Sequence, residues 1–175
     1  MLFLKKAFTL IELMIVIVIM GVVYTLVIGN FKKLSEKSTN LSLKNLKEFL
    51  QSYPHKESVK FVCLDNCKNC FVLIDGKKQD IKIKNFLDKS VKVYRYDFDL
   101  GAMQKENTGY FNQDNIEEDV CFSYEVDGEG VGDQVLVEYK NSVYDFTPYF
   151  EPPQVYSSVE EAVNAKQDLM TKIIQ

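Results

Sequence analysis

Apolar residues dominate the chain from Phe8 to Phe31, where 24 residues carry a single charged side chain, Glu12. A helix of this length rises about 36 Å, which is enough to cross a bilayer core of about 30 Å. The run is longer than the apolar core of a cleaved secretory signal peptide, and no small-x-small cleavage pattern follows it. We therefore expect the segment to remain in the mature protein as a membrane helix.

A different apolar spacing follows between residues 32 and 54. The apolar positions recur near the helical period, and Pro54 ends the pattern. These positions are Leu34, Leu41, Leu46, Phe49, Leu50 and Tyr53. We predict one continuous helix over residues 8–53, with an apolar first half and an amphipathic second half that packs on a soluble domain.

Beyond Pro54 the apolar pattern changes to a period of two, which is typical of half-buried strands. We predict strands over residues 58–64, 70–75, 80–86, 90–100, 119–126 and 134–146. Turn residues cluster at 75–78 and 127–133. Short strands that follow one another closely favour antiparallel pairing.

The last segment returns to helical spacing. Ser158 and Glu161 form a capping-box pattern before an amphipathic run, which predicts a short C-terminal helix. The whole pattern predicts an α+β fold, in which a long N-terminal helix packs on an antiparallel β-sheet and a short helix closes the chain.

The net charge of the chain is small, but its charged residues are unevenly distributed along the sequence. The formal net charge of −4, from 21 basic and 25 acidic residues, does not favour nucleic-acid binding by bulk charge. Residues 55–95 hold ten basic against five acidic side chains, and residues 96–151 hold two against fourteen. This segregation indicates either two solvated faces or complementarity between subunits.

Lysines alternate with apolar residues in part of the basic segment, at Lys82, Lys84 and Lys92. Lysines at such positions protect the solvent side or the edge of a sheet. The same stripe fits a polyanion such as DNA, so binding of a nucleic acid stays open. The chain has one histidine, His55, which excludes a histidine-rich metal site.

Glu12 is the informative residue of the apolar segment. A carboxylate at the centre of a membrane helix costs about 2.5–3.5 kcal/mol on insertion scales, and less near a helix end. No basic residue lies between Phe8 and Phe31. A cation that neutralises Glu12 must therefore come from outside this segment.

The stretch KKAFTLIELMIVIVIMGVV, residues 5–23, resembles the N-terminus of type IV pilin-like proteins, which include the pseudopilins of type II secretion and DNA-uptake (competence) machines. The resemblance covers roughly the first 30 residues. It implies cleavage by prepilin peptidase between Ala7 and Phe8, followed by N-methylation of Phe8. The leader in this family usually ends in glycine, whereas Ala7 stands here.

The resemblance also implies a role for Glu12. Cleavage creates a new α-amine on Phe8, and Glu12 of one subunit pairs with that amine on its neighbour as the helices stack into a filament. Expected partners are prepilin peptidase, other pilin-like subunits, the inner-membrane assembly platform and the membrane. No catalytic residue, cofactor or enzymatic activity is expected.

Five segments follow from these expectations. They are a leader (1–7), a transmembrane or filament-spine helix (8–31), its amphipathic continuation (32–54), an antiparallel β domain (55–150), and a hinge with the C-terminal helix (151–175). We expect a single-pass inner-membrane protein whose C-terminal domain lies in the periplasm, and then a periplasmic or surface filament. The alternative is a signal-anchored periplasmic protein with a binding or thiol-redox domain.

Four cysteines add a redox expectation. An even count in an exported domain favours disulfides over a four-thiolate zinc site or free thiols. The cysteines are Cys63, Cys67, Cys70 and Cys121. Three pairings are open, and we favour Cys67–Cys70 with Cys63–Cys121 because the long bridge removes more unfolded-state entropy.

A glycine-rich stretch at residues 127–138 resembles a calcium loop. Its candidate positions are Asp127, Glu129, Gly132, Asp133 and Glu138. However, Val131 stands where an oxygen ligand is needed, and strands flank the loop. The pattern favours a hairpin connection and leaves calcium binding open; we expect no metal.

Overall fold

The computed structural model describes residues 10–36, 41–106, 109–112 and 114–174, with the backbone alone at 24–36 and 173–174. The chain forms two units, Met1–Asn40 and Leu41–Gln175. In the first unit the described residues form one helix, α1 (Leu10–Glu36). Among all residues that the structure describes, no helix combines the length and the hydropathy that crossing a membrane requires.

The continuous helix predicted over residues 8–53 is wrong in its second half. Leu41 and Ser42 are not helical, and a 3₁₀ helix, η2 (Leu43–Asn45), leads into the short α2 (Leu46–Gln51). Ser42 is extended, with φ −142° and ψ 167°, and its backbone N–H donates to Oδ1 of Asn45 at 2.7 Å. Serine and asparagine favour such local bonds over helix continuation.

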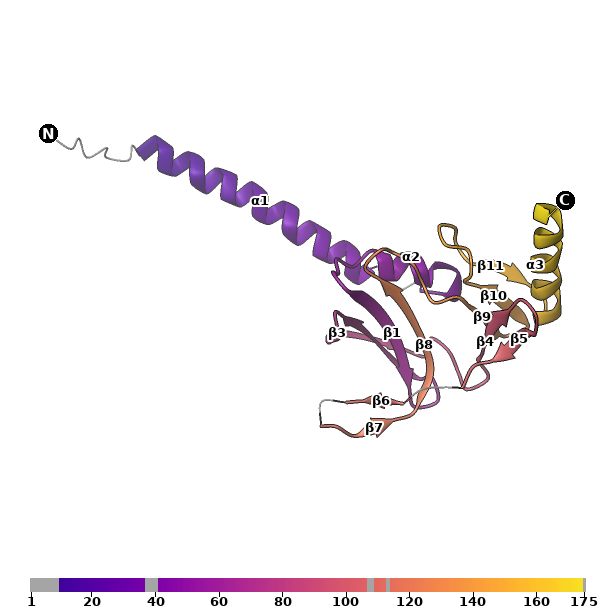
Figure 1. Cartoon of the computed structure of the whole chain (residues 1–175). Helices are drawn as coiled ribbons and strands as arrows, with labels where there is room; N and C mark the ends of the chain where they lie inside the picture. Colours follow the sequence, from indigo (N-terminus) through magenta and orange to yellow (C-terminus); the bar gives the residue numbers. More distant parts are fainter. Residues whose placement is uncertain (1–9, 37–40, 107–108, 113, 175) are drawn as a thin grey trace, which may run out of the picture. The chain divides into compact units, whose positions relative to one another are not determined.

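The second unit contains two larger antiparallel sheets and a hairpin (Figure 1). The four-stranded sheet has the order β3 (Lys77–Lys84), β2 (Asn69–Ile74), β1 (Ser58–Leu64), β8 (Val120–Asp127). The five-stranded sheet has the order β11 (Gln154–Tyr156), β10 (Ser142–Asp145), β9 (Val135–Tyr139), β4 (Lys92–Asp97), β5 (Gly101–Gln104). The hairpin pairs β6 (Tyr110–Phe111) with β7 (Glu117–Glu118). With the C-terminal helix α3 (Val159–Ile174), these elements confirm the predicted α+β fold class.

Each predicted strand segment overlaps an observed strand, and segment 134–146 holds two, β9 and β10. Lys140 and Asn141 have φ of 47° and 59°, so they form a tight turn between β9 and β10. Positive φ at both central residues is the geometry of the two-residue hairpin turn. Strands β5, β6, β7 and β11 were not predicted.

The main core lies where α2 contacts β1 and β8. Leu46 and Leu50 of α2 are fully buried, as the amphipathic spacing predicted. Phe61 of β1 meets Phe122 of β8 with ring centroids 6.4 Å apart. Five residues at alternate positions of β1 and β8, which lie on one face of the sheet, are also 0% exposed. They are Val59, Phe61, Phe122, Tyr124 and Val126.

The opposite face of the four-stranded sheet has a smaller apolar cluster. It comprises Val62, Leu64, Phe71 and Val120. Tyr110 of β6 packs against this cluster, with its ring centroid 5.4 Å from that of Phe71. Hairpin β6–β7 therefore covers part of the face that α2 leaves open.

Helix α3 packs on the five-stranded sheet, against β10, β11 and β5 (Figure 1). Ala162 is fully buried in a cluster with Leu136 and Val143. The predicted cap forms in part. Ser158 Oγ accepts a hydrogen bond from the Glu161 backbone at 3.1 Å, but the Glu161 carboxylate binds Ser157 rather than Ser158.

A buried ion pair fastens α3 to β10. Nζ of Lys166 lies 2.6 Å from Oδ2 of Asp145, and the two side chains are 13% and 3% exposed. Thr147 donates to Oδ1 of Asp145 from its backbone N–H at 2.9 Å and from its hydroxyl at 2.7 Å. Lys166 also donates to the Thr147 hydroxyl. The carboxylate and the ammonium thus lose water but keep hydrogen-bond partners, as buried charges require.

We expect Lys166→Met to destabilise the chain by about 3 kcal/mol, because it leaves the buried carboxylate of Asp145 without its cation. Urea unfolding of the full chain in detergent micelles measures this loss. Lys60→Met is the matched control, since Lys60 and Glu125 pair at 3.3 Å with side chains 36% and 38% exposed. The control should cost less than about 1 kcal/mol. Equal costs would contradict the role assigned to the buried pair.

Candidate functional site

The predicted assembly segment lies on α1. Glu12 is in the first turn of this helix, where the positive end of the helix dipole favours a carboxylate. Large apolar side chains from Leu10 to Val23 are exposed, from 45% at Val16 to 80% at Leu10. A helix that is apolar on all sides requires an apolar environment or partner helices. Ala7 and Phe8 lie outside the described residues, so cleavage, methylation and pairing with Glu12 stay predictions.

The four cysteines form two disulfides, Cys63–Cys70 and Cys67–Cys121. The expectation of disulfides is confirmed, and the favoured pairing, Cys67–Cys70 with Cys63–Cys121, is wrong. Cys63 and Cys70 stand directly opposite each other on β1 and β2, with Cα atoms 4.0 Å apart. Because all four thiols are bonded, the four-thiolate zinc site and the free thiols are excluded.

Backbone geometry explains the second bridge. The register between β1 and β8 shifts between Cys63 and Leu64, so Cys121 is an extra residue on β8. Such a bulge turns a side chain away from the regular alternation. Across from it, Asp65, Asn66 and Cys67 all have positive φ, at 52°, 57° and 67°. This left-handed turn is costly for non-glycine residues, and it holds Cys67 within a Cα distance of 5.5 Å of Cys121.

Two of the candidate calcium positions, Asp127 and Asp133, form hydrogen bonds with the backbone. No cluster of ligands that could hold a metal ion occurs among the described residues. Oδ1 of Asp127 instead accepts from the backbone N–H groups of Glu129 and Val131, at 3.0 and 2.8 Å. Oδ2 of Asp133 accepts from the Glu125 backbone at 3.1 Å. These bonds shape the connection between β8 and β9.

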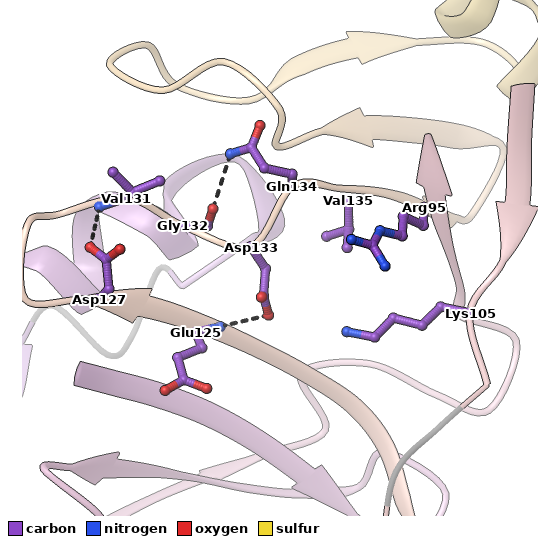
Figure 2. Close-up of a pocket in the computed structure, with 9 residues that line it drawn as sticks. All are labelled: Arg95, Lys105, Glu125, Asp127, Val131, Gly132, Asp133, Gln134 and Val135. Carbon is purple, nitrogen blue, oxygen red and sulfur yellow. Dashed lines mark hydrogen bonds between the residues drawn. The ribbon is translucent and has the colours of Figure 1, made fainter. Parts of the chain in front are cut away.

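A cavity of about 520 Å³ lies between this connection and the β4–β5 hairpin. Figure 2 shows Arg95 and Lys105 on one side of it, and the carboxylates of Glu125, Asp127 and Asp133 on the other. None of its described lining residues is a serine, cysteine or histidine. The lining therefore places two cations opposite three carboxylates.

His55 joins two parts of the second unit. Its Nδ1 lies 2.8 Å from the carbonyl oxygen of Tyr53, and its Nε2 lies 3.0 Å from that of Asp127. Neutral imidazole has one N–H, so only the imidazolium donates to both carbonyls. These two hydrogen bonds, Tyr53 first, raise the pKa of His55, and the nearby carboxylates of Asp75 and Asp127 raise it further against the effect of burial.

Sequence reasoning missed the Lys166–Asp145 pair and the cavity cations. The alternation in β10 could have predicted the pair, because it places Asp145 on the same buried face as the apolar Val143. An acid on a buried face requires a partner. Arg95 and Lys105 gave no such signal, since only the three-dimensional arrangement of β8, β9 and β4 brings them to one cavity.

Comparison with known proteins locates the functional signal in the first unit. Residues 3–28 match the prokaryotic N-terminal methylation motif, a range that contains Ala7, Phe8 and Glu12. The match supports a type IV pilin-like chain. A prepilin-type leader of this kind implies processing by prepilin peptidase, anchoring in a membrane and assembly with other pilin-like subunits. No curated protein and no solved structure matches the chain.

We expect the two disulfides to contribute unequally. They close loops with sequence separations of 54 for Cys67–Cys121 and 7 for Cys63–Cys70. Replacing a pair with alanines should cost about 4 kcal/mol for the first bridge and about 2 kcal/mol for the second. Urea unfolding of both double variants measures the difference, and equal losses would contradict the loop-entropy account.

The His55 contacts predict a stability term that depends on pH. Because folding raises the pKa of His55, its stabilisation is complete below the unfolded value of about 6.5 and is lost as pH rises through the folded value. The urea midpoint of the wild type should therefore exceed that of His55→Gln most at pH 5, with a gap that narrows towards pH 8. A gap that stays constant or widens with pH would rule out this bridge.

Proposed function

We propose that the chain is a structural subunit, a pseudopilin or minor pilin, that assembles through its N-terminal helix into a periplasmic or surface filament for protein secretion or DNA uptake. The observation that carries the proposal is the methylation motif over residues 3–28, with Glu12 near the start of an apolar helix. The role requires no catalytic residue and no cofactor.

The physical reason is the cost of the Glu12 charge in an apolar filament spine. Prepilin peptidase cuts before Phe8 and leaves an α-amine there, four residues from Glu12 in the sequence. When helices stack, the amine of one subunit meets Glu12 of the next. A subunit in the wrong register leaves a buried charge without a partner, which disfavours that register.

The alternative, a binding or thiol-redox domain on a membrane anchor, has weaker support. Cys67 and Cys70 have the spacing of a redox pair but belong to two different disulfides. A plain anchor also has no use for Glu12, whose charge makes insertion harder.

We expect Glu12→Val to insert into the membrane at least as well as the wild type, since it removes an intramembrane charge. Assembly should fall sharply, because the Phe8 amine of the adjoining subunit loses its counter-charge. Crosslinking to other filament subunits, beside a blot of the membrane fraction, measures both effects.

Two controls make this test specific. Intact mass should show loss of residues 1–7 in wild type and variant alike, so that failed processing is separated from failed docking. Glu12→Asp keeps the charge on a shorter side chain and should be intermediate. Wild-type assembly by Glu12→Val would refute the role of Glu12, and a retained Met1 in assembled protein would refute processing.

A further inference from the structure

A second cavity, of about 310 Å³, lies beside β3 at the edge of the four-stranded sheet. Three lysines of β3 line it, Lys78, Lys82 and Lys84. Two acids also line it, Asp65 of the β1–β2 turn and Glu118 of β7. We refer to this site as the lysine cavity.

The positive charge of the lysine cavity exceeds the negative charge among its lining residues. Its two carboxylates already accept hydrogen bonds from side-chain amides. Asp65 accepts from Asn69 at 2.9 Å, and Glu118 accepts from Asn112 at 2.8 Å. No ion pair joins the three lysines to any residue that the structure describes. Three cations against two carboxylates leave the lining with a charge of +1.

An irregularity of β3 concentrates this charge. In a regular strand Lys78, Asp80, Lys82 and Lys84 would share one face. Here Phe71 pairs with Lys82 and Leu73 pairs with Lys78. An advance of two residues along β2 therefore corresponds to four residues along β3, which makes β3 irregular at this point. Asp80 has no partner on β2 and does not line the cavity. The lining therefore contains the three lysines of this face of β3 but not its one acidic residue.

The lysine cavity also has apolar walls. Phe71, Leu64 and Ile83 contribute to the lining, and Nζ of Lys78 lies 4.0 Å from the centroid of the Phe71 ring. A ligand that combines carboxylates with apolar groups would fit both properties of the site.

The turn between β4 and β5 has this complementary chemistry. Residues Asp97, Phe98, Asp99 and Leu100, here called the acidic knob, connect the two strands. Phe98 is 54% and Leu100 72% exposed. Oδ1 of Asp97 accepts from the backbone N–H groups of Asp99 and Leu100, at 2.9 and 3.0 Å. The knob is thus held by its own hydrogen bonds, which lowers the entropic cost of docking it.

We propose that the acidic knob of one copy of this chain docks into the lysine cavity of another. The two carboxylates of the knob meet lysines that form no ion pair with any described residue, and Phe98 or Leu100 covers the apolar wall. No knob residue lines the cavity of its own chain, so the contact joins different molecules. It uses two different surfaces, and such a head-to-tail contact repeats along an open filament. The proposal rests on the proposed function as a filament subunit.

Charge reversal tests the contact. Lys82→Glu alone and Asp99→Lys alone should each lower assembly about tenfold, because like charges then face each other. The double variant should recover assembly, since the reversed pair is attractive again. Lys89→Glu and Glu129→Lys change the same charges away from the cavity and the knob, and they should assemble like the wild type.

A direct crosslink identifies the residues. A carbodiimide joins a lysine to a carboxylate without a spacer, and the full chain in detergent micelles is the substrate. Mixing isotopically heavy and light chains should yield a heavy–light product that links Lys78, Lys82 or Lys84 to Asp97 or Asp99. Absence of this product, or no rescue in the double variant, would overturn the docking.

The outcomes separate this contact from the proposed function. If the wild type assembles and depends on Glu12, but Lys82→Glu assembles equally well, the docking is wrong and the filament role stands. If assembly never occurs yet the heavy–light crosslink forms, the filament role is wrong and the docking stands. If Lys82→Glu assembles normally but loses binding of a labelled oligonucleotide, the cavity serves a polyanion and the docking is overturned.

Discussion

Two disulfides at one end of β1 are the constraint on which the second unit depends. Cys63–Cys70 ties β1 to β2, and Cys67–Cys121 ties their turn to β8. Together they hold three strands and a left-handed turn that its own φ angles disfavour. The same turn places Asp65 in the wall of the lysine cavity. The two disulfides therefore stabilise both the core and the lysine cavity, which we assign to subunit contact.

Buried and exposed charged side chains have different roles in this chain. Lys166 and Asp145 are buried together and fasten α3 to the five-stranded sheet. Lys47 of α2 is 5% exposed, and its Nζ donates to the carbonyl oxygens of Pro148 and Tyr149 at 2.8 and 2.5 Å. Burial lowers the pKa of this lysine, so its two carbonyl contacts are needed to keep the charge in place. The three lysines of the lysine cavity, in contrast, are exposed and form no ion pair with a described residue, and we assign them to the proposed contact with another copy of the chain.

The sequence predicted elements well where one physical signal acted alone. The period-two run at Ser58–Leu64 coincides with β1, because no turn residue interrupts it. The helix over residues 8–53 was wrong because periodicity ignored the local bonds of Ser42 and Asn45. The disulfide pairing was not accessible, since it depends on a strand register and a bulge that only tertiary structure fixes. The predicted strand over 90–100 ran through the β4–β5 turn because its alternation of apolar and acidic residues continues there.

This continued alternation bears on how the two units divide the work of assembly. Apolar side chains give little directional preference, so in the filament that we propose Glu12 is the side chain of the first unit that specifies register. In the second unit, Phe98 and Leu100 occupy positions that alternation would place in a core, yet they are exposed on a turn. In the contact that we propose, Asp97 and Asp99 keep the turn solvated before assembly. They also repel other acidic surfaces of the chain, whose residues 96–151 are strongly acidic. Only a basic site with apolar walls satisfies both halves of the knob, and the lysine cavity has that combination.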